Sequence, residues 1–457
     1  MSFLSPGAVT RIARLWMLAL LLSFAVAQPA AAQSTLRDSE TELLFRDIST
    51  PLIAAAKLDK ATDVVLLNDP EINAFVATGQ TVYIQSGLLL AADNVNQLQG
   101  VIAHELGHVA GGHAIRMQSG NKEAEGISIA TMVLGALAMA AGAGDAGMGI
   151  MMAGQRAAMG RFMAFTRTQE SSADSAGAKY LSAAGISGKG SIDFFKKLQN
   201  QEYRLTARLP EDSYDRTHPL SSERIAALLQ VYEKDPAWNR PPDPALEARF
   251  QRVKAKLLGF INPKLATTRY PESDLSVPAR YARAYAYHVG AYPEKALYEA
   301  TSLLKTNPDD PFFLELQGQI LLESGKPAEA IAPLREATIR AGNQPLIAAM
   351  LGHALIATEK PENFVEAKQV LKAAVSRDNQ NPFAWYQLGI IYDREGDPAR
   401  AALATAERNN LEGNPKLALV SAEMALKGIP AGSPDYLRAQ DIAMVSRTEL
   451  KKKKRDR

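Results

Sequence analysis

The sequence contains no cysteine, few aromatic residues and no large excess of charge of either sign. Without cysteine the chain cannot form disulfides, so its stability must come from a buried core and from any metal that it binds. A formal net charge of +2 over 457 residues argues against a nucleic-acid-binding protein. Long β-branched runs are also missing, whereas Ala, Leu and Met are plentiful. The chain is therefore expected to be mainly α-helical with a small β-sheet, in two or three domains.

Residues 1–32 have the pattern of a secretory signal peptide. Arg11 and Arg14 precede an apolar run over residues 15–27, and small residues follow up to Ala32. The run is too short to span a bilayer comfortably, although an uncleaved membrane anchor is the alternative. We expect cleavage after Ala32, and an exported protein without cysteine fits a bacterial periplasm.

Residues 33–240 are expected to form the first folded domain. Their apolar residues change from helical to alternating spacing and back again. These patterns predict, in order, a helix, a strand, a β-hairpin and a second helix, over residues 37–58, 64–67, 73–84 and 93–109. Asp93 and Asn94 offer N-caps for the last of them.

Residues 126–160 are extremely apolar, being mostly Gly, Ala and Met with only Asp145 and Arg156 charged. A glycine-rich break at residues 142–147 divides them into two apolar helices of about sixteen residues or fewer, too short to cross a bilayer. A buried helical hairpin is the simpler interpretation. The alternative is a mobile, methionine-rich flap that touches a membrane or an unfolded substrate.

Residues 277–450 contain an internal repeat. Prolines recur 34, 37 and 33 residues apart, at Pro311, Pro345, Pro382 and Pro415. Small residues follow at fixed offsets, as in tetratricopeptide repeats, where paired helices touch. This predicts an α-solenoid, joined to the first domain by a helical connector over residues 241–276. Residues 451–457 are a basic tail, interpreted as a solvated end, with contact to an anionic membrane or a partner as the alternative.

The pattern H-E-x-x-H occurs at residues 104–108, within a predicted helix. Four residues on a helix turn through about 400°, so His104 and His108 share one face and can hold one zinc ion. Glu105 lies beside them, where it can accept a proton from water and return it to the leaving amine. Two structural histidines are the alternative, but the pattern rarely arises by chance.

A catalytic zinc needs a third protein ligand, and Glu170 is the better candidate. Glu170 and Asp174 are four residues apart on a predicted helix, so one carboxylate could bind the metal while the other accepts the free N–H of a ligand histidine. A solvated acidic face is the alternative. His113 points away from His108 on a straight helix, and we leave it out as a helix-end residue or a supporting one. His218, in a loop, would by itself be a surface histidine.

Together these motifs resemble the HtpX and CAAX-prenyl-protease group of gluzincin metallopeptidases, and within it the BepA-like periplasmic proteins that carry tetratricopeptide repeats. The resemblance covers nearly the full chain and rests on residues 73–75, 86–89, 104–108, 167–177 and 217–219. It implies one zinc ion on His104, His108 and Glu170, with Glu105 as catalytic base and Asp174 supporting a ligand. It also implies that His218 approaches the zinc, either to stabilise an oxyanion or to cap the site in a resting form.

The same resemblance implies a biological role. The protein would be a periplasmic endopeptidase that degrades misfolded or stalled envelope proteins, with a chaperone-like part in outer-membrane protein assembly. Its partners would be unfolded outer-membrane proteins and, through the repeats, the barrel assembly machinery, with peripheral contact to the outer membrane. The strand ending near Tyr83 would be the sheet edge that pairs with an extended substrate. The alternative is a mostly latent peptidase that acts as a repeat-based chaperone or adaptor.

Overall fold

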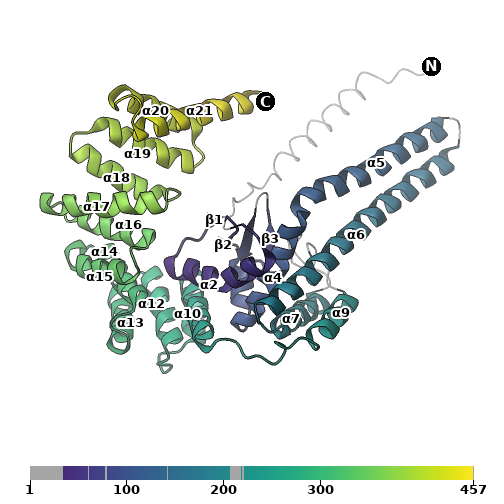
Figure 1. Ribbon diagram of the computed structural model, residues 1–457, viewed down its shortest axis with the longest axis horizontal. Helices are drawn as coiled ribbons and strands as arrows, with labels where there is room; N and C mark the ends of the chain where they lie inside the picture. The colour runs from purple at the N-terminus through teal and green to yellow at the C-terminus, as the bar shows by residue number, and fades with distance from the viewer. Residues whose placement is uncertain are drawn as a thin grey trace, which may run out of the picture.

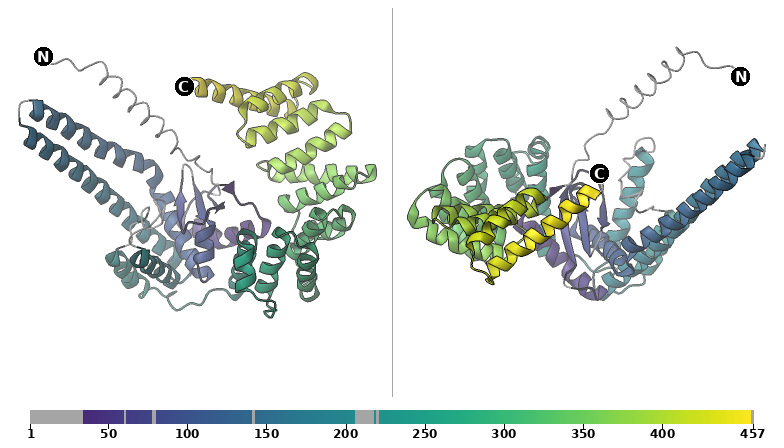
Figure 2. Two further views of the ribbon diagram at one scale, coloured as in Figure 1. Left: turned by 180° about the vertical axis from the view of Figure 1, so that it is seen from behind. Right: turned by 90° about the horizontal axis from the view of Figure 1, so that it is seen from above.

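The computed structural model describes residues 34–59, 61–77, 80–140, 143–205, 218 and 221–455. The predicted signal peptide lies outside the described residues. A helical region with a small sheet occupies the middle of the molecule (Figure 1). A long helical hairpin projects from one side of it, and an arc of paired helices curves away on the other side (Figure 2). The mainly α-helical fold and its solenoid are as predicted.

The small sheet has four strands in the order β1-β2-β4-β3. Strands β2 and β4 are parallel, and β1 and β3 are antiparallel to their neighbours. The strands β1, β2, β3 and β4 span Ser34–Thr35, Asp63–Asn68, Ala74–Val76 and Thr81–Gln85. The expectation that the strand containing Tyr83 is a sheet edge is wrong, because β2 and β3 pair with β4 on its two sides. The edge on that side is β3.

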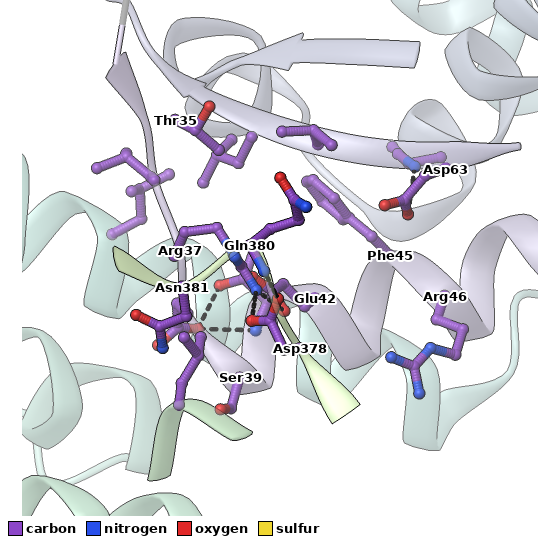
Figure 3. Close-up of a pocket in the computed structure, with 18 of the residues that line it drawn as sticks. Thr35, Arg37, Ser39, Glu42, Phe45, Arg46, Asp63, Asp378, Gln380 and Asn381 are labelled. Atoms are coloured by element: carbon purple, nitrogen blue, oxygen red, sulfur yellow. Dashed lines mark hydrogen bonds and ion pairs between the residues drawn. The ribbon is translucent and has the colours of Figure 1, made fainter. Parts of the chain in front are cut away.

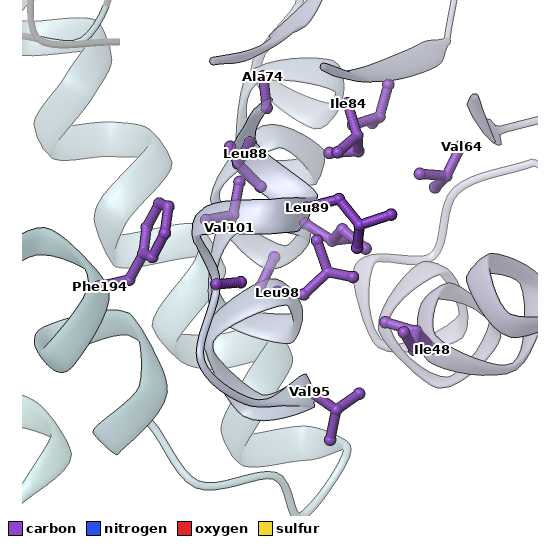
Figure 4. Close-up of a cluster of buried hydrophobic side chains, with 14 of the residues drawn as sticks. Ile48, Val64, Ala74, Ile84, Leu88, Leu89, Val95, Leu98, Val101 and Phe194 are labelled. Carbon is purple, nitrogen blue, oxygen red and sulfur yellow. The ribbon is translucent and has the colours of Figure 1, made fainter. Parts of the chain in front are cut away.

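The core of the central region lies between this sheet and two helices, α2 (Ser39–Ala56) and α4 (Val95–Gly111). Helix α2 buries Leu44, Ile48 and Leu52, which recur every four residues on one face. Helix α4 is almost wholly buried, and its Asn94 cap accepts from the backbone N–H of Gln97. Figure 4 shows the apolar side chains of the strands and helices meeting between the elements.

Five further helices surround the core. They are α3, α6, α7, α9 and α10, spanning Ser86–Ala91, Gly144–Ala183, Lys189–Leu205, Ser222–Tyr232 and Pro244–Ile261. Helix α10 begins the expected connector, yet it buries Phe250 and Val253 in the same core as α2 and α4. The repeats are therefore attached to the central region through a helix that is part of its core.

The hairpin consists of α5 (His113–Ala140) and the first part of α6. Both helices are much longer than expected, because each continues without a break into the charged sequence beside the apolar segment. The expected burial is also wrong. Helix α5 packs along α6, but an 18-residue apolar window of α5, with mean hydropathy 1.4, is only 6% buried. By length and composition alone α5 could cross a membrane.

The arc consists of paired helices, and from α14 onward the first helix of each pair begins at one of the repeated prolines. Helices α11 to α16 span Pro263–Arg269, Val277–Val289, Pro293–Thr306, Pro311–Glu323, Pro327–Arg340 and Pro345–Ala357. Helices α17 to α21 span Pro361–Arg377, Pro382–Arg394, Pro398–Leu411, Pro415–Gly428 and Pro434–Arg455. Proline suits the first turn of a helix because its missing N–H needs no partner there. Each of Pro311, Pro345, Pro382 and Pro415 starts a helix as predicted.

The arc meets the central region across buried ion pairs and a cavity. Lys256 of α10 lies 2.8 Å from both Asp38 Oδ2 and Glu40 Oε2. Arg252 of α10 also pairs with Glu40, and its Nη1 lies 2.6 Å from Asp310 Oδ2 of the arc. Beside this junction, a cavity of about 1080 Å³ is lined by residues of the sheet, α2 and the repeats. Figure 3 shows polar side chains of both regions facing each other across it.

Candidate metal centre

Helix α4 supplies the two histidines and the glutamate of the H-E-x-x-H pattern. His104, Glu105 and His108 are all buried, and Glu105 has no exposed surface. The helix ends at Gly112, which has φ +61° and therefore adopts the left-handed conformation that favours glycine. The chain turns there, so the hairpin begins immediately beyond the histidines.

Helix α6 brings two carboxylates to the same place. It crosses α4 where Gly107 faces Ala173, and a Cβ on Gly107 would lie 2.7 Å from the Ala173 carbonyl oxygen. This close approach needs glycine, and it places Glu170 and Asp174 beside His104. Asp174 Oδ1 lies 3.0 Å from His104 Nδ1, while Glu170 Oε2 lies 3.4 Å from His104 Nε2.

Four side chains converge on one point. His104, His108, Glu170 and His218 each offer a ligand atom, and these atoms lie within 4.8 Å of one another. The Nε2 atoms of His104 and His108 are 3.1 Å apart, and Glu170 Oε1 lies 3.4 Å from His108 Nε2. His218 Nδ1 lies 3.4 Å from His104 Nε2 and 3.1 Å from Glu170 Oε1. Sequence reasoning named all four residues.

The cluster fits a tetrahedral zinc ion. Zinc–ligand bonds of about 2.05 Å place tetrahedral ligand atoms about 3.3 Å apart. Five of the six distances between the ligand side chains are 3.1 to 3.4 Å, with one or the other oxygen of Glu170, and the four ligand atoms all lie within 4.8 Å of one another. Neither oxygen of Glu105 accepts a hydrogen bond from a described residue, although Oε1 lies 3.6 Å from His218 Nε2. A buried carboxylate without a donor is suited to accept a proton from water.

Charge accumulates in this buried cluster and shifts its pKa values. Burial alone would lower the pKa of His104, but its hydrogen bonds to the carboxylates of Asp174 and Glu170, and their negative charges, raise it to about 10. Burial would raise the pKa of Glu170, but the positive charge of His218 and bonds from the other histidines hold it well below its usual range. Without a metal, protons on histidine neutralise the carboxylates. Metal binding must therefore displace these protons from the histidines.

Two supporting residues had no role, or an uncertain one, in the sequence interpretation. Arg224 of α9 places Nε 2.7 Å from Asp174 Oδ2 and Nη2 3.1 Å from Glu170 Oε2, so it fixes both carboxylates. The sequence indicates Arg224 only as a basic residue in the helix that follows His218. His113 Nδ1 lies 2.9 Å from His108 Nδ1, because the break at Gly112 turns His113 back toward the site. His113 is therefore a supporting residue.

The chain is similar to known proteases over most of its length. The profile of peptidase family M48 matches residues 13–231. The beta-barrel assembly-enhancing protease of Yersinia pestis is 26% identical over 387 residues, which cover 82% of this chain and 76% of that protein. The protein of the same name from Escherichia coli strain K12 is 28% identical, over 80% of this chain and 75% of its own length.

Two further similarities cover one region each. The metalloprotease LoiP of Escherichia coli strain K12 is 31% identical over 171 residues, 36% of this chain and 60% of that protein. Among solved structures, the tetratricopeptide-repeat protein YrrB matches 38% of this chain and 91% of its own, at 20% identity and a TM-score of 0.31.

Proposed function

This chain carries a peptidase family M48 domain and is a metalloprotease, and we propose that it uses one zinc ion to cleave unfolded or misassembled outer-membrane proteins. The observation that carries this proposal is the convergence of His104, His108 and Glu170 at the distances that zinc requires. The names of the relatives, which are beta-barrel assembly-enhancing proteases, support the substrate class, and the signal-peptide pattern of residues 1–32 supports a place in the periplasm.

The proposed chemistry is hydrolysis of a peptide bond. Zinc in this site would supply a Lewis acid that polarises the scissile carbonyl and activates water near neutral pH. Glu105 accepts the proton of the attacking water and donates it to the leaving amine. Asp174 accepts from His104 and fixes its tautomer, so that the opposite ring nitrogen faces the metal site. Arg224 holds both carboxylates in these positions.

His218 is proposed to cap the site in a resting form. Its Nδ1 lies close to both His104 Nε2 and Glu170, which is where a fourth ligand would stand. A catalytic zinc site must keep that position open for water or substrate. His218 must therefore move away before hydrolysis, so most molecules would be latent. This arrangement also supports the second candidate function, a chaperone or adaptor whose repeats bind partners of the assembly machinery.

Zinc content and cleavage of unfolded outer-membrane barrel protein and casein test the proposal in four proteins. The wild type should hold one zinc ion, and Glu105→Gln should retain it yet lose at least about 100-fold in cleavage rate. His218→Ala should cleave faster than the wild type, whereas the control His353→Ala, in the repeats, should match it. Absence of zinc from the wild type would refute the metal site. A slower His218→Ala would assign that histidine to oxyanion stabilisation.

The adaptor function is tested by complementation in cells that lack the protein. If Glu105→Gln rescues their envelope defects fully, the repeats carry the main function and the peptidase is accessory. If it rescues nothing while holding zinc and folding normally, cleavage is the essential activity.

A further inference from the structure

The distal half of the α5–α6 hairpin, described over residues 126–140 and 143–155, exposes large apolar side chains to solvent. Ile129, Leu134 and Leu137 are 62%, 56% and 62% exposed. The other large apolar side chains that it exposes are Met132, Val133, Met139, Met148 and Met152. An apolar surface of this kind on a soluble protein marks an interaction site.

These exposed side chains do not belong in the interface between α5 and α6. That space is already filled, because Gly135 and Gly147 let the helices approach closely, with Met151 packed over Gly135 and Met139 over Gly147. On α5 the exposed residues Met132, Ile129 and Leu134 span about 200° of the helix circumference at 100° per residue. The outer surface of the distal half is therefore apolar around nearly its whole circumference. The two helices cover the remainder where they face each other.

Charge is distributed very differently along the hairpin. The distal half has one charged residue, Asp145, in the first turn of α6. The base, residues 113–125 and 156–167, exposes five cations and two carboxylates. The cations are Arg116, Lys122, Arg156, Arg161 and Arg167. An apolar end followed by a basic collar is complementary to a bilayer with anionic head groups.

We propose that the distal half of the hairpin inserts from one side into a phospholipid bilayer, with the basic collar at the head groups. Residues 126–140 of α5 are about 22 Å long at 1.5 Å per residue, which is less than the bilayer core of about 30 Å. The hairpin therefore enters from one side and does not cross. A second copy of the chain would cover only one face, whereas lipid surrounds the hairpin on all sides.

The insertion places the metal centre at a fixed height above the membrane. Helix α5 begins at His113, which touches His108, and α6 carries Glu170, so both helices run without a break from the site to the collar. Gly126 lies thirteen positions beyond His113 on the helix, which gives about 20 Å. Figures 1 and 2 show both helices running from the central region out to the far end of the hairpin. With that end in lipid, the peptidase acts on chains held close to the lipid surface.

Flotation with vesicles of phosphatidylethanolamine and phosphatidylglycerol tests the insertion in the full mature chain. The wild type should float, and the double variant Val133→Asp/Leu137→Asp should partition at least about 100-fold less, because it places charge where lipid contact is expected. The matched control Leu275→Asp/Val365→Asp alters two residues of similar exposure, one just before the repeats and one within them, and should float like the wild type. Asp145→Asn should bind more tightly than the wild type, since it removes the distal charge.

A second readout separates lipid from the other occupants. Tryptophan in Leu134→Trp should be quenched by lipids brominated in the acyl chains and not by those brominated at the head group. Quenching by neither, or flotation that the double aspartate variant leaves unchanged, would overturn the proposal. So would a wild type that stays with the soluble fraction and forms a dimer that this variant dissociates. Cleavage of soluble casein by the variant should remain normal, so this test can fail without the peptidase assignment failing.

Discussion

Two clusters of buried charged residues in this protein look alike in composition but differ in how their charges are balanced. At the junction between α2, α10 and the repeats, Lys256 lies within 2.8 Å of Asp38 and Glu40. At the metal centre, the atoms of His104, His108, Glu170 and His218 point at one another across 3.1 to 3.4 Å. The junction cluster contains the cationic side chains that balance its carboxylates, whereas the cluster at the metal centre leaves room for a metal cation.

This difference separates a structural ion cluster from a binding site. Burying a charged group costs desolvation free energy. This cost is offset only where the group contacts an opposite charge or makes a hydrogen bond. Lys256 and Arg252 do this at the junction, and Tyr281 also donates to Glu40 across 2.9 Å. At the metal centre the converging atoms are all lone-pair donors once the histidines are neutral. Such a cluster is stable only with protons or a metal between its members.

Removing the junction cation should have the largest effect on stability. Lys256→Met leaves the buried Glu40 and the half-buried Asp38 with less charge compensation, and we expect a loss of about 3–5 kcal/mol in the free energy of unfolding, measured by urea denaturation. Adding Asp38→Asn and Glu40→Gln to this variant should restore part of the loss, because the uncompensated carboxylates are then neutral. Lys264→Met, an exposed lysine of α11, is the control and should change little.

An equal loss in the single and the triple variants would contradict the view that charge balance holds the junction together. It would mean that the aliphatic stem of Lys256 carries the stability.

The metal centre should respond to zinc, whereas the junction should not. Zinc at 100 times its dissociation constant should raise the free energy of unfolding by about 2.7 kcal/mol, measured on protein first treated with a chelator. His108→Ala should lose this gain, and Lys256→Met should keep it although it starts from a lower stability. If His108→Ala gains as much from zinc as the wild type does, zinc binds elsewhere.

The carboxylate that orients His104 should have a smaller effect. Asp174→Asn weakens the hydrogen bond to His104 Nδ1 and the pair with Arg224, and we expect zinc affinity to fall about 10–100-fold. Competition with a zinc chelator of known affinity measures the change. Asp193→Asn, an exposed carboxylate on α7, is the control. Unchanged affinity in Asp174→Asn would show that packing alone orients His104.

The sequence predicts local features of this molecule well. The face shared by His104 and His108 follows from the helical repeat, and the pairing of Glu170 with Asp174 follows from the same geometry. Each proline that starts a repeat affects only the first turn of the helix that it begins. Each of these features depends on residues at most a few positions apart, so no knowledge of the surrounding elements is needed.

The features that the sequence does not predict depend on contacts between distant segments. Arg224 reaches the site only because α9 packs beside α6, which no local pattern reveals. The family resemblance implies a sheet edge at Tyr83, and the pairing of β4 with β2 that contradicts it joins residues such as Val65 and Tyr83, which no local pattern relates. The hairpin was expected to be buried because composition shows that a segment is apolar but not whether anything covers it.

A titratable carboxyl group at the junction should give an effect that is absent at low pH and appears only as the pH rises. Burial, with the nearby charge of Asp38, raises the pKa of Glu315 to about 8 from 4.5, while Lys256 opposes the shift. Between these values the folded protein keeps a proton that the unfolded chain releases, so stability falls as pH rises, by at most about 1.4 kcal/mol per pH unit. Glu315→Gln cannot lose this proton. Urea denaturation of both proteins should therefore give similar stabilities near pH 4.5 and a growing advantage for the variant up to about pH 8. A constant difference across this range would mean that Glu315 titrates alike in the folded and unfolded chains, and that Lys256 fully balances the junction carboxylates.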